Sequence, residues 1–224
     1  MRQVVLDTET TGLSTKDGHR IIEIGCVELL HRKLTGNTFH TYLNPNRLID
    51  EGAMRVHGIT NEFVSDKPYF KEMVGKFKHF VQGAELIIHN AAFDIGFLEY
   101  ELSLLSDPWI AISSQCKIID TLAMAKDKHP GQRNNLDALC KRYDISNQHR
   151  TFHGALLDAS LLAEVYLAMT GGQGTLFSLE SEQLGQSGLG GGHPRRLNTV
   201  KGLRVVRATE AECLENDNFV ANLL

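Results

Sequence analysis

The sequence predicts an α/β protein in which helices cover a mixed β-sheet. Three strand-like segments follow one another early in the chain, and strand-like and helix-like segments alternate after them. Strands joined by short turns pair antiparallel, whereas an intervening helix lets two strands run parallel, so this order gives a mixed sheet. The 224 residues are 42% hydrophobic and 22% charged, which is typical of a soluble globular domain, here with an appendage.

Short apolar segments bounded by turn residues predict the strands. The first, residues 3–6, reads as a buried strand. The third ends before Pro45, because proline cannot donate a backbone hydrogen bond to a sheet. In chain order, the expected strands are residues 3–6, 20–30, 37–43, 85–89 and 117–120.

Apolar residues at helical spacing and terminal signals predict the helices. Pro68 opens the first, since proline is favoured in a first helical turn. In the second, Ile95, Leu98 and Leu102 recur three or four residues apart. The expected helices are residues 68–81, 92–105, 121–128, 136–143 and 154–169.

The composition changes near residue 170, which divides the chain into a domain, a linker and a tail. We expect a domain over residues 1–170 and a flexible linker over 171–196, because a Gly-, Ser- and Gln-rich segment buries too little surface to become ordered. Residues 197–224 hold a strand-like segment and a capping box at Thr209 and Glu212 that would start a helix. So small an element is expected to fold on a partner.

Charge and cysteine content narrow the functional classes. The formal net charge of −4 argues against passive coating of nucleic acid, but not against an enzyme that engages a polyanion through metal ions. No apolar run is long enough to cross a membrane, and an early acidic residue argues against a signal peptide, so a cytoplasmic protein is expected. The scattered cysteines are expected to be reduced and buried: Cys26, Cys116, Cys140 and Cys213.

Asp7 and Glu9 come at the end of the first strand. Side chains two residues apart in a strand point to the same face, so the two carboxylates lie close together and would repel without a cation. The alternative is that they simply begin the turn at residues 10–12. The tripeptide alone does not decide between a metal site and a turn.

Two further acidic residues and one histidine favour a metal site over a turn. Asp94 follows a strand end, where α/β sheets place active sites, although a carboxylate in a first helical turn is also favoured by the helix dipole. Asp158 lies among apolar neighbours in the last helix, where an unpartnered charge is costly, and His153 stands at or just before its start. A zinc pair of His149 with His153 is disfavoured, because Arg150 occupies the place where a zinc protease motif has glutamate.

Four carboxylates and a histidine suit two-metal phosphodiester hydrolysis. Carboxylate oxygens are the ligands that Mg²⁺ and Mn²⁺ prefer. Two such ions about 3.5–4 Å apart stabilise the attacking and leaving oxygens of an in-line displacement. A histidine can take the proton from the attacking water.

The order and spacing of these acidic residues and histidines resemble the three motifs of the DEDD exonuclease superfamily, histidine subtype. These are Asp7-x-Glu9, His89-Asn-x-x-Phe-Asp94 and His153-x-x-x-x-Asp158, and the similarity extends over residues 2–170. The resemblance implies a ribonuclease H-like fold and 3′→5′ exonuclease activity with two Mg²⁺ or Mn²⁺ ions. It implies that Asp7, Glu9, Asp94 and Asp158 bind the metals and that His153 is the general base.

The resemblance also implies contacts with the substrate. Residues 56–60 resemble the segment that lines the family's nucleotide pocket, so His57 would contact the terminal nucleotide, alongside Asp7, Glu9 and Asp158. A glutamate is often found five residues before that histidine. Here that position is Gly52, with Glu51 displaced by one, which leaves a substrate contact in doubt.

The tail resembles the docking segments of family members that proofread for replicative DNA polymerases. Gln173, Leu176 and Phe177 match a short sliding-clamp-binding motif, although Gly174 departs from the usual leucine, and an ordinary linker is the alternative. Residues 197–224 would bind the polymerase catalytic subunit, which would raise the local concentration of exonuclease at the DNA 3′ end. A further small, theta-like subunit is left open.

The resemblance implies that mispaired 3′-terminal nucleotides are removed from DNA as 5′-mononucleotides. Two rival functions remain: trimming of RNA by the same chemistry, and a polymerase–clamp scaffold with little catalysis. The intact set of site residues disfavours the scaffold, because a scaffold has no need to cluster carboxylates.

Overall fold

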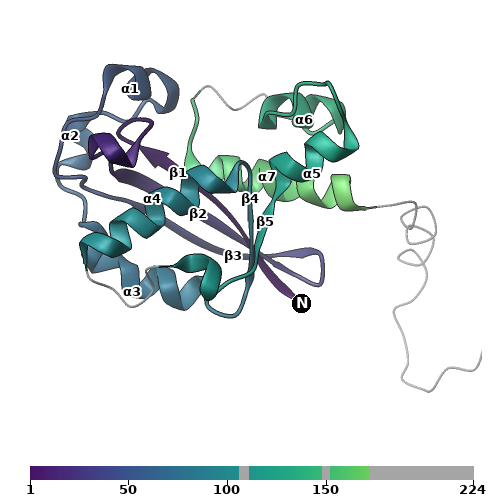
Figure 1. Cartoon of the computed structure of the whole chain (residues 1–224), viewed down its shortest axis with the longest axis horizontal. Helices are drawn as coiled ribbons and strands as arrows, with labels where there is room; N and C mark the ends of the chain where they lie inside the picture. The colour runs from purple at the N-terminus through teal and green to yellow at the C-terminus, as the bar shows by residue number, and fades with distance from the viewer. Residues whose placement is uncertain (106–110, 148–151, 172–224) are drawn as a thin grey trace, which may run out of the picture. The chain divides into compact units, whose positions relative to one another are not determined.

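A five-stranded mixed sheet forms the centre of the protein, in a computed structural model that describes residues 1–105, 111–147 and 152–171 (Figure 1). The strand order is β3-β2-β1-β4-β5. The β1–β2 and β2–β3 pairs are antiparallel, and the β1–β4 and β4–β5 pairs are parallel, which confirms the expected mixed sheet. The strands are β1 (Arg2–Thr10), β2 (Ile21–Leu30), β3 (Lys33–Tyr42), β4 (Glu85–Ile88) and β5 (Ile118–Asp120).

Seven α-helices and two short 3₁₀ turns accompany the sheet in the described residues. All five helices expected from the sequence are present, with ends that differ by a few residues. The helices are α1 (Glu51–His57), α2 (Asn61–Val64), α3 (Phe70–Val81), α4 (Ala91–Leu104), α5 (Thr121–Lys128), α6 (Leu136–Arg142) and α7 (Ala155–Thr170), and the 3₁₀ turns are η1 (Thr15–Asp17) and η2 (Ile112–Ser114).

The two short helices α1 and α2 were not expected from the sequence. Each has two turns or fewer, too short for a clear 3.6-residue pattern. Their ends are nevertheless well defined: Gly58 ends α1 with a φ of 72°, and the Thr60 side chain accepts a hydrogen bond from the Phe63 amide (3.2 Å) at the start of α2.

Strands β1 and β3 are longer than the sequence suggested. β1 continues through Thr10, so Asp7 and Glu9 lie within a strand, and the view that they begin a turn is wrong. Pairing with β2 through Glu23 holds this end of the strand. β3 begins at Lys33 because His31 and Arg32 both adopt positive φ angles of 49° and 64°, which makes a two-residue hairpin turn.

The two faces of the sheet are covered by different helices (Figure 1). On one face, Val4 and Leu6 of β1 pack in an apolar cluster with residues of α3 and α4. On the other, Val5 packs with residues of α5, α6 and α7. Because strand side chains alternate, Asp7 and Glu9 share the α7 face, whereas Thr8 faces α4. The end of β1 therefore carries polar residues toward both layers.

Three of the four cysteines lie within the described residues. Cys26, Cys116 and Cys140 are reduced and buried, as expected, and burial raises the pKa of the Cys26 thiol. Within the described residues, every helix is too short or too polar to span a bilayer. Cys213, the linker over 171–196, the clamp-like motif and the tail over 197–224 lie outside the described residues, apart from Gly171.

Candidate active site

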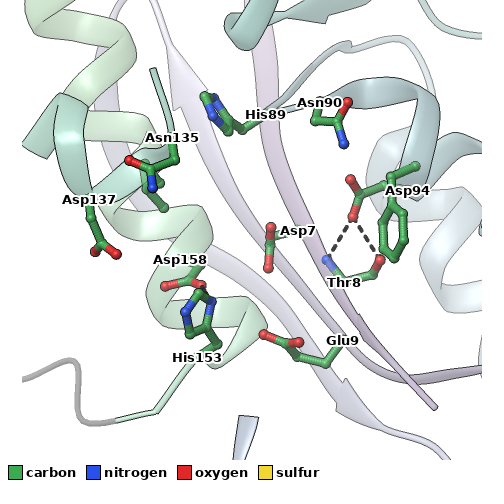
Figure 2. Close-up of a pocket in the computed structure, with 12 residues that line it drawn as sticks. Asp7, Thr8, Glu9, His89, Asn90, Asp94, Asn135, Asp137, His153 and Asp158 are labelled. Carbon is green, nitrogen blue, oxygen red and sulfur yellow. Dashed lines mark hydrogen bonds and ion pairs between the residues drawn. The ribbon is translucent and has the colours of Figure 1, made fainter. Parts of the chain in front are cut away.

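A pocket of about 260 Å³ lies at the end of the sheet where β1, β4 and β5 all finish (Figure 2). The carboxyl ends of parallel strands are where α/β proteins place their sites. All five of the expected metal and catalytic residues line it. The lining residues are Asp7, Thr8, Glu9, His89, Asn90, Phe93, Asp94, Asn135, Leu136, Asp137, His153 and Asp158.

Glu9, His153 and Asp158 come together on the α7 side of the pocket. One ligand atom from each of them lies within 4.8 Å of the other two. Nδ1 of His153 lies 3.3 Å from Oδ2 of Asp158, whose side chain is 4% exposed, while the His153 side chain is 44% exposed. His153 precedes the first residue of α7, so a buried carboxylate and a half-exposed imidazole face each other at the start of that helix.

Asp94 reaches the same pocket from α4, on the other side of the sheet. Its Oδ1 accepts hydrogen bonds from the Thr8 amide (3.0 Å) and the Thr8 hydroxyl (2.7 Å). In Figure 2, Asp7 lies between this pair and Asp158. The Asp94 carboxylate therefore ties α4 to β1, whatever it also contributes to the dipole of its own helix.

Burial raises the pKa of Asp94 to about 7, although its hydrogen bonds with Thr8 oppose the shift. The residue is only 3% exposed. A carboxyl group with such a pKa lacks a nearby positive charge that would stabilise its ionised form. A bound divalent cation would supply that charge, so the carboxyl group fits a metal site.

Asp120 holds the loop that precedes α4. Its carboxylate accepts hydrogen bonds from the amides of Asn90 and Ala91, both at 3.3 Å, and from the Leu122 amide at 2.8 Å. Asn90 has a φ of 66°, an uncommon conformation that turns the chain sharply from β4 into α4. The loop thereby delivers Asp94 to the pocket one turn later.

His57 lies beside a second pocket of about 550 Å³ that shares Glu9 with the first. The imidazole is buried, and its Nδ1 accepts a hydrogen bond from the Ile59 amide (3.0 Å). Burial lowers the pKa of His57, so the neutral ring carries its proton on Nε2. Nε2 is itself fully buried and makes no hydrogen bond of good geometry among the described residues, although the Thr10 backbone lies near enough to the ring to offset part of the lowering of the pKa.

Gly52 occupies the position where the family often has a glutamate, five residues before His57. Gly52 lines the second pocket and contributes no side chain to it. Glu51 does not line it, and its side chain is 87% exposed, 4.0 Å from Arg55. The displaced glutamate therefore does not replace the absent contact.

Sequence reasoning missed several residues of the site. Thr8 donates the hydrogen bonds to Asp94. Asp137 of α6 and Asn135, the residue just before that helix, line another wall of the first pocket. Glu23 is a buried carboxylate directly opposite Glu9 in β2, and its Oε1 lies 2.7 Å from Nε2 of His40. Only Glu23 left a signal in the sequence, as one of the two acidic residues, with Glu28, of the otherwise apolar strand at residues 21–30.

The donors in the first pocket suit a hard divalent cation. They are carboxylate oxygens from β1, α4 and α7 together with one imidazole, and described cysteines do not line the pocket. A mixed sheet of this order has the ribonuclease H-like fold, and the pocket at the end of β1 suits a divalent cation.

Comparison with known proteins gives the family. The family model described as Exonuclease (RNase T) matches residues 4–166. The chain is 54% identical over 216 residues to DNA polymerase III subunit epsilon of Escherichia coli (strain K12), covering 94% of this chain and 88% of that protein. It is 43% identical to the subunit of the same name from Rickettsia felis over all of this chain and 97% of the relative.

Solved structures agree with the fold. Exonuclease X in complex with 5′ overhanging duplex DNA matches with a TM-score of 0.59 and 27% identity, covering 75% of this chain and 90% of that one. The nuclease domain of 3′hExo, a DEDDh family member bound to rAMP, matches with a TM-score of 0.64 and 22% identity over the same shares. The chain belongs to the exonuclease family, and it is a divalent-metal-dependent exonuclease.

Gly25 of β2 determines how closely α7 approaches the site. It lies opposite Asp7 in the β1–β2 register. A Cβ atom added to Gly25 would lie 2.2 Å from the Leu156 amide nitrogen and 2.3 Å from the Ala155 carbonyl carbon, both backbone atoms. The first turn of α7 therefore rests directly on this glycine, which brings Asp158 to the end of β1.

We expect Gly25→Ala to damage both stability and activity. The added methyl group must push the start of α7 away, at a cost of about 1–3 kcal/mol in the free energy of unfolding. Displacement of His153 and Asp158 should slow DNA hydrolysis by about 10²-fold. Urea denaturation and digestion of a labelled oligonucleotide measure the two effects.

Gly75→Ala is the matched control, because a Cβ atom at Gly75 of α3 has no atoms within 4 Å. It should keep the wild-type rate. Wild-type stability and rate in Gly25→Ala would show that this close contact does not place α7.

Proposed function

We propose that this exonuclease is the proofreading subunit of DNA polymerase III, which removes mispaired 3′-terminal nucleotides from DNA as 5′-mononucleotides. The observation that carries the proposal is the convergence of Asp7, Glu9, Asp94, His153 and Asp158 from three separate elements on one pocket. The relatives named DNA polymerase III subunit epsilon, matched over nearly the whole chain, support the choice among exonucleases.

Four carboxylates would hold the metal ions: Asp7, Glu9, Asp94 and Asp158. Two Mg²⁺ or Mn²⁺ ions bound there supply positive charge that stabilises the attacking and leaving oxygens of the phosphodiester. The hydrogen bonds from Thr8 keep the Asp94 carboxylate directed toward β1. The contact of Asp158 with Nδ1 orients the imidazole of His153.

His153 acts as the general base. When Nδ1–H donates to Asp158, the lone pair lies on Nε2, which takes a proton from the attacking water. The water oxygen forms a bond to phosphorus, and the bond between phosphorus and the 3′ oxygen of the preceding nucleotide breaks. The 3′ oxygen takes a proton from solvent as the terminal residue departs as a 5′-mononucleotide, and the proton held by His153 returns to solvent.

His57 contributes to binding of the terminal nucleotide. Its ring forms part of the wall of the second pocket, which also includes Glu9, and would pack against the sugar or base of that nucleotide. The pocket accepts an unpaired nucleotide, so a mispaired end, which frays more easily, reaches it more often. Preference for mismatches then arises from the DNA as much as from the protein.

Partners compensate for the weak attraction of an acidic protein to DNA. We propose that residues 197–224 bind the polymerase catalytic subunit and that Gln173, Leu176 and Phe177 bind the sliding clamp. Tethering raises the effective concentration of the exonuclease at the primer end. A small theta-like subunit is a third candidate partner, and the assembly works in the cytoplasm.

Digestion of a 5′-labelled single-stranded DNA oligonucleotide tests the proposed function. With Mg²⁺ or Mn²⁺ we expect a ladder that shortens from the 3′ end, and with EDTA no cleavage. An RNA oligonucleotide of the same sequence should be cut more slowly, and faster cleavage of RNA would favour RNA trimming. Lack of cleavage by folded protein with either metal would favour the scaffold.

Deletion of residues 197–224 tests the polymerase contact. Because all described pocket residues precede residue 172, the shortened chain should digest oligonucleotides at the wild-type rate. It should lose copurification with the polymerase catalytic subunit when the two are coexpressed. Retained copurification would remove the tail from this interface.

A further inference from the structure

The residues just before α7 pack against the end of α1. The ring of Phe152 lies over the backbone of Gly58: a Cβ atom built on Gly58 would be 3.0 Å from Cγ of Phe152 and 3.2 Å from both Cδ atoms. Gly58 also has a φ of 72°, which side chains other than glycine rarely adopt. A glycine at this position thus both ends α1 and leaves room for an aromatic ring.

A backbone hydrogen bond joins the same two segments. The amide of His153 donates to the carbonyl of Val56 over 3.1 Å. Val56 is in the last turn of α1, where carbonyl groups have no partner within the helix. His153 therefore satisfies a carbonyl at the end of α1, and its own main chain is held there next to Phe152.

Phe152 does not serve the hydrophobic core. It is 55% exposed and belongs to none of the apolar clusters among the described residues. Its ring instead lies against the backbone of Gly58, at a helix end that carries functional residues. An aromatic ring placed here restricts where the next residue, His153, can go.

The end of α1 contacts both the second pocket and the segment that carries His153. Val56 and His57 line the second pocket, where the terminal nucleotide binds, together with Glu9. The Val56 carbonyl and Gly58 also hold residues 152 and 153. The helix end that recognises the nucleotide is thus the support on which the imidazole of His153 is placed near Asp158.

We propose that Phe152 is a positioning residue for catalysis. Its ring packs on Gly58 and keeps the backbone of His153 at the end of α1, which holds the imidazole close to Glu9 and Asp158. The proposal rests on the role of His153 as general base. Loss of the ring leaves the imidazole in the chain but less well placed, which slows proton removal without weakening binding of the DNA end.

The test compares Phe152→Ala and Phe152→Leu with the wild-type full-length chain on single-stranded DNA with Mg²⁺. For Phe152→Ala we expect kcat to fall by about 10- to 100-fold, as misplacement of a catalytic group does, with KM unchanged within about twofold. Phe152→Leu keeps an apolar side chain on Gly58 and should recover most of kcat. The thermal unfolding midpoint should not change, because the ring is half exposed.

A double-variant cycle shows whether Phe152 acts through His153. When His153 is already alanine, Phe152→Ala should change the remaining rate by less than about twofold, because there is no imidazole left to position. Phe63→Ala is the matched control: Phe63 is an exposed phenylalanine of α2 that lines neither pocket, and its replacement should leave kcat unchanged.

The outcomes separate this inference from the function on which it rests. Wild-type kcat in His153→Ala would overturn the general base and with it this proposal. If His153→Ala lowers kcat but Phe152→Ala has the kcat of the wild type, the positioning role alone is overturned. An equal loss from Phe152→Ala in both backgrounds would show that the ring acts on the substrate or the fold instead of through His153.

Discussion

Replacement of Asp7 and Glu9 together by alanine will abolish hydrolysis of DNA. Both side chains leave β1 on the face of α7, and they line the same pocket as Asp94 and Asp158. Without them two of the four carboxylates are gone, and the site loses metal charge worth several kcal/mol in the transition state, which corresponds to at least about a thousandfold in rate. The labelled oligonucleotide assay measures this loss directly.

The fold of the double variant should survive. Asp7 and Glu9 are partly exposed, and the apolar residues of β1 that form the core, Val4, Val5 and Leu6, are unchanged. Two neighbouring carboxylates repel each other when no cation is bound, so their removal should not lower the thermal unfolding midpoint measured in EDTA. An unfolded variant would contradict this expectation.

The control removes two carboxylates elsewhere. Glu62 and Asp66 are exposed and line neither pocket, so their double alanine variant changes the net charge equally and should keep the wild-type rate. If the Asp7 and Glu9 variant digested DNA as fast as this control, both residues would be excluded from the site.

The order of strands and main helices could be predicted from the sequence because each depends on local patterns. Residues 3–6 are apolar enough to be recognised, but the continuation of β1 to Thr10 depends on pairing with β2, a contact between distant parts of the chain. Helices α1 and α2 are too short to show a pattern and are held by their caps. Local propensity is a weak guide where tertiary contacts decide.

The carboxylates and His153 could be identified from motif spacing, but their supports could not. Gly25 is one of 20 glycines in the chain, and only the structure shows that the backbone of α7 rests on it. Thr8 and Asp120 act through hydrogen bonds to residues far along the chain. Spacing reveals which residues carry the chemistry, whereas their placement depends on contacts that no single segment encodes.

His153→Ala is expected to slow hydrolysis by about 10²–10⁴-fold, the usual contribution of a positioned general base. The imidazole is close enough to Glu9 and Asp158 to be considered as a metal ligand as well, since one ligand atom from each residue lies within 4.8 Å of the others. The two roles differ in what the variant does to metal binding. Loss of a base slows chemistry and leaves the carboxylates to bind Mn²⁺, whereas loss of a ligand weakens Mn²⁺ binding itself.

Calorimetric titration with Mn²⁺, run beside the digestion assay, separates a base from a ligand. For His153→Ala we expect a Mn²⁺ affinity close to that of the wild type together with the slow rate, and His79→Ala, which replaces an exposed histidine of α3, should match the wild type in both. A large fall in Mn²⁺ affinity would reassign His153 as a ligand. The preference for oxygen ligands shown by Mg²⁺ and Mn²⁺ argues for the base, because the four carboxylates of Asp7, Glu9, Asp94 and Asp158 would hold the ions without it.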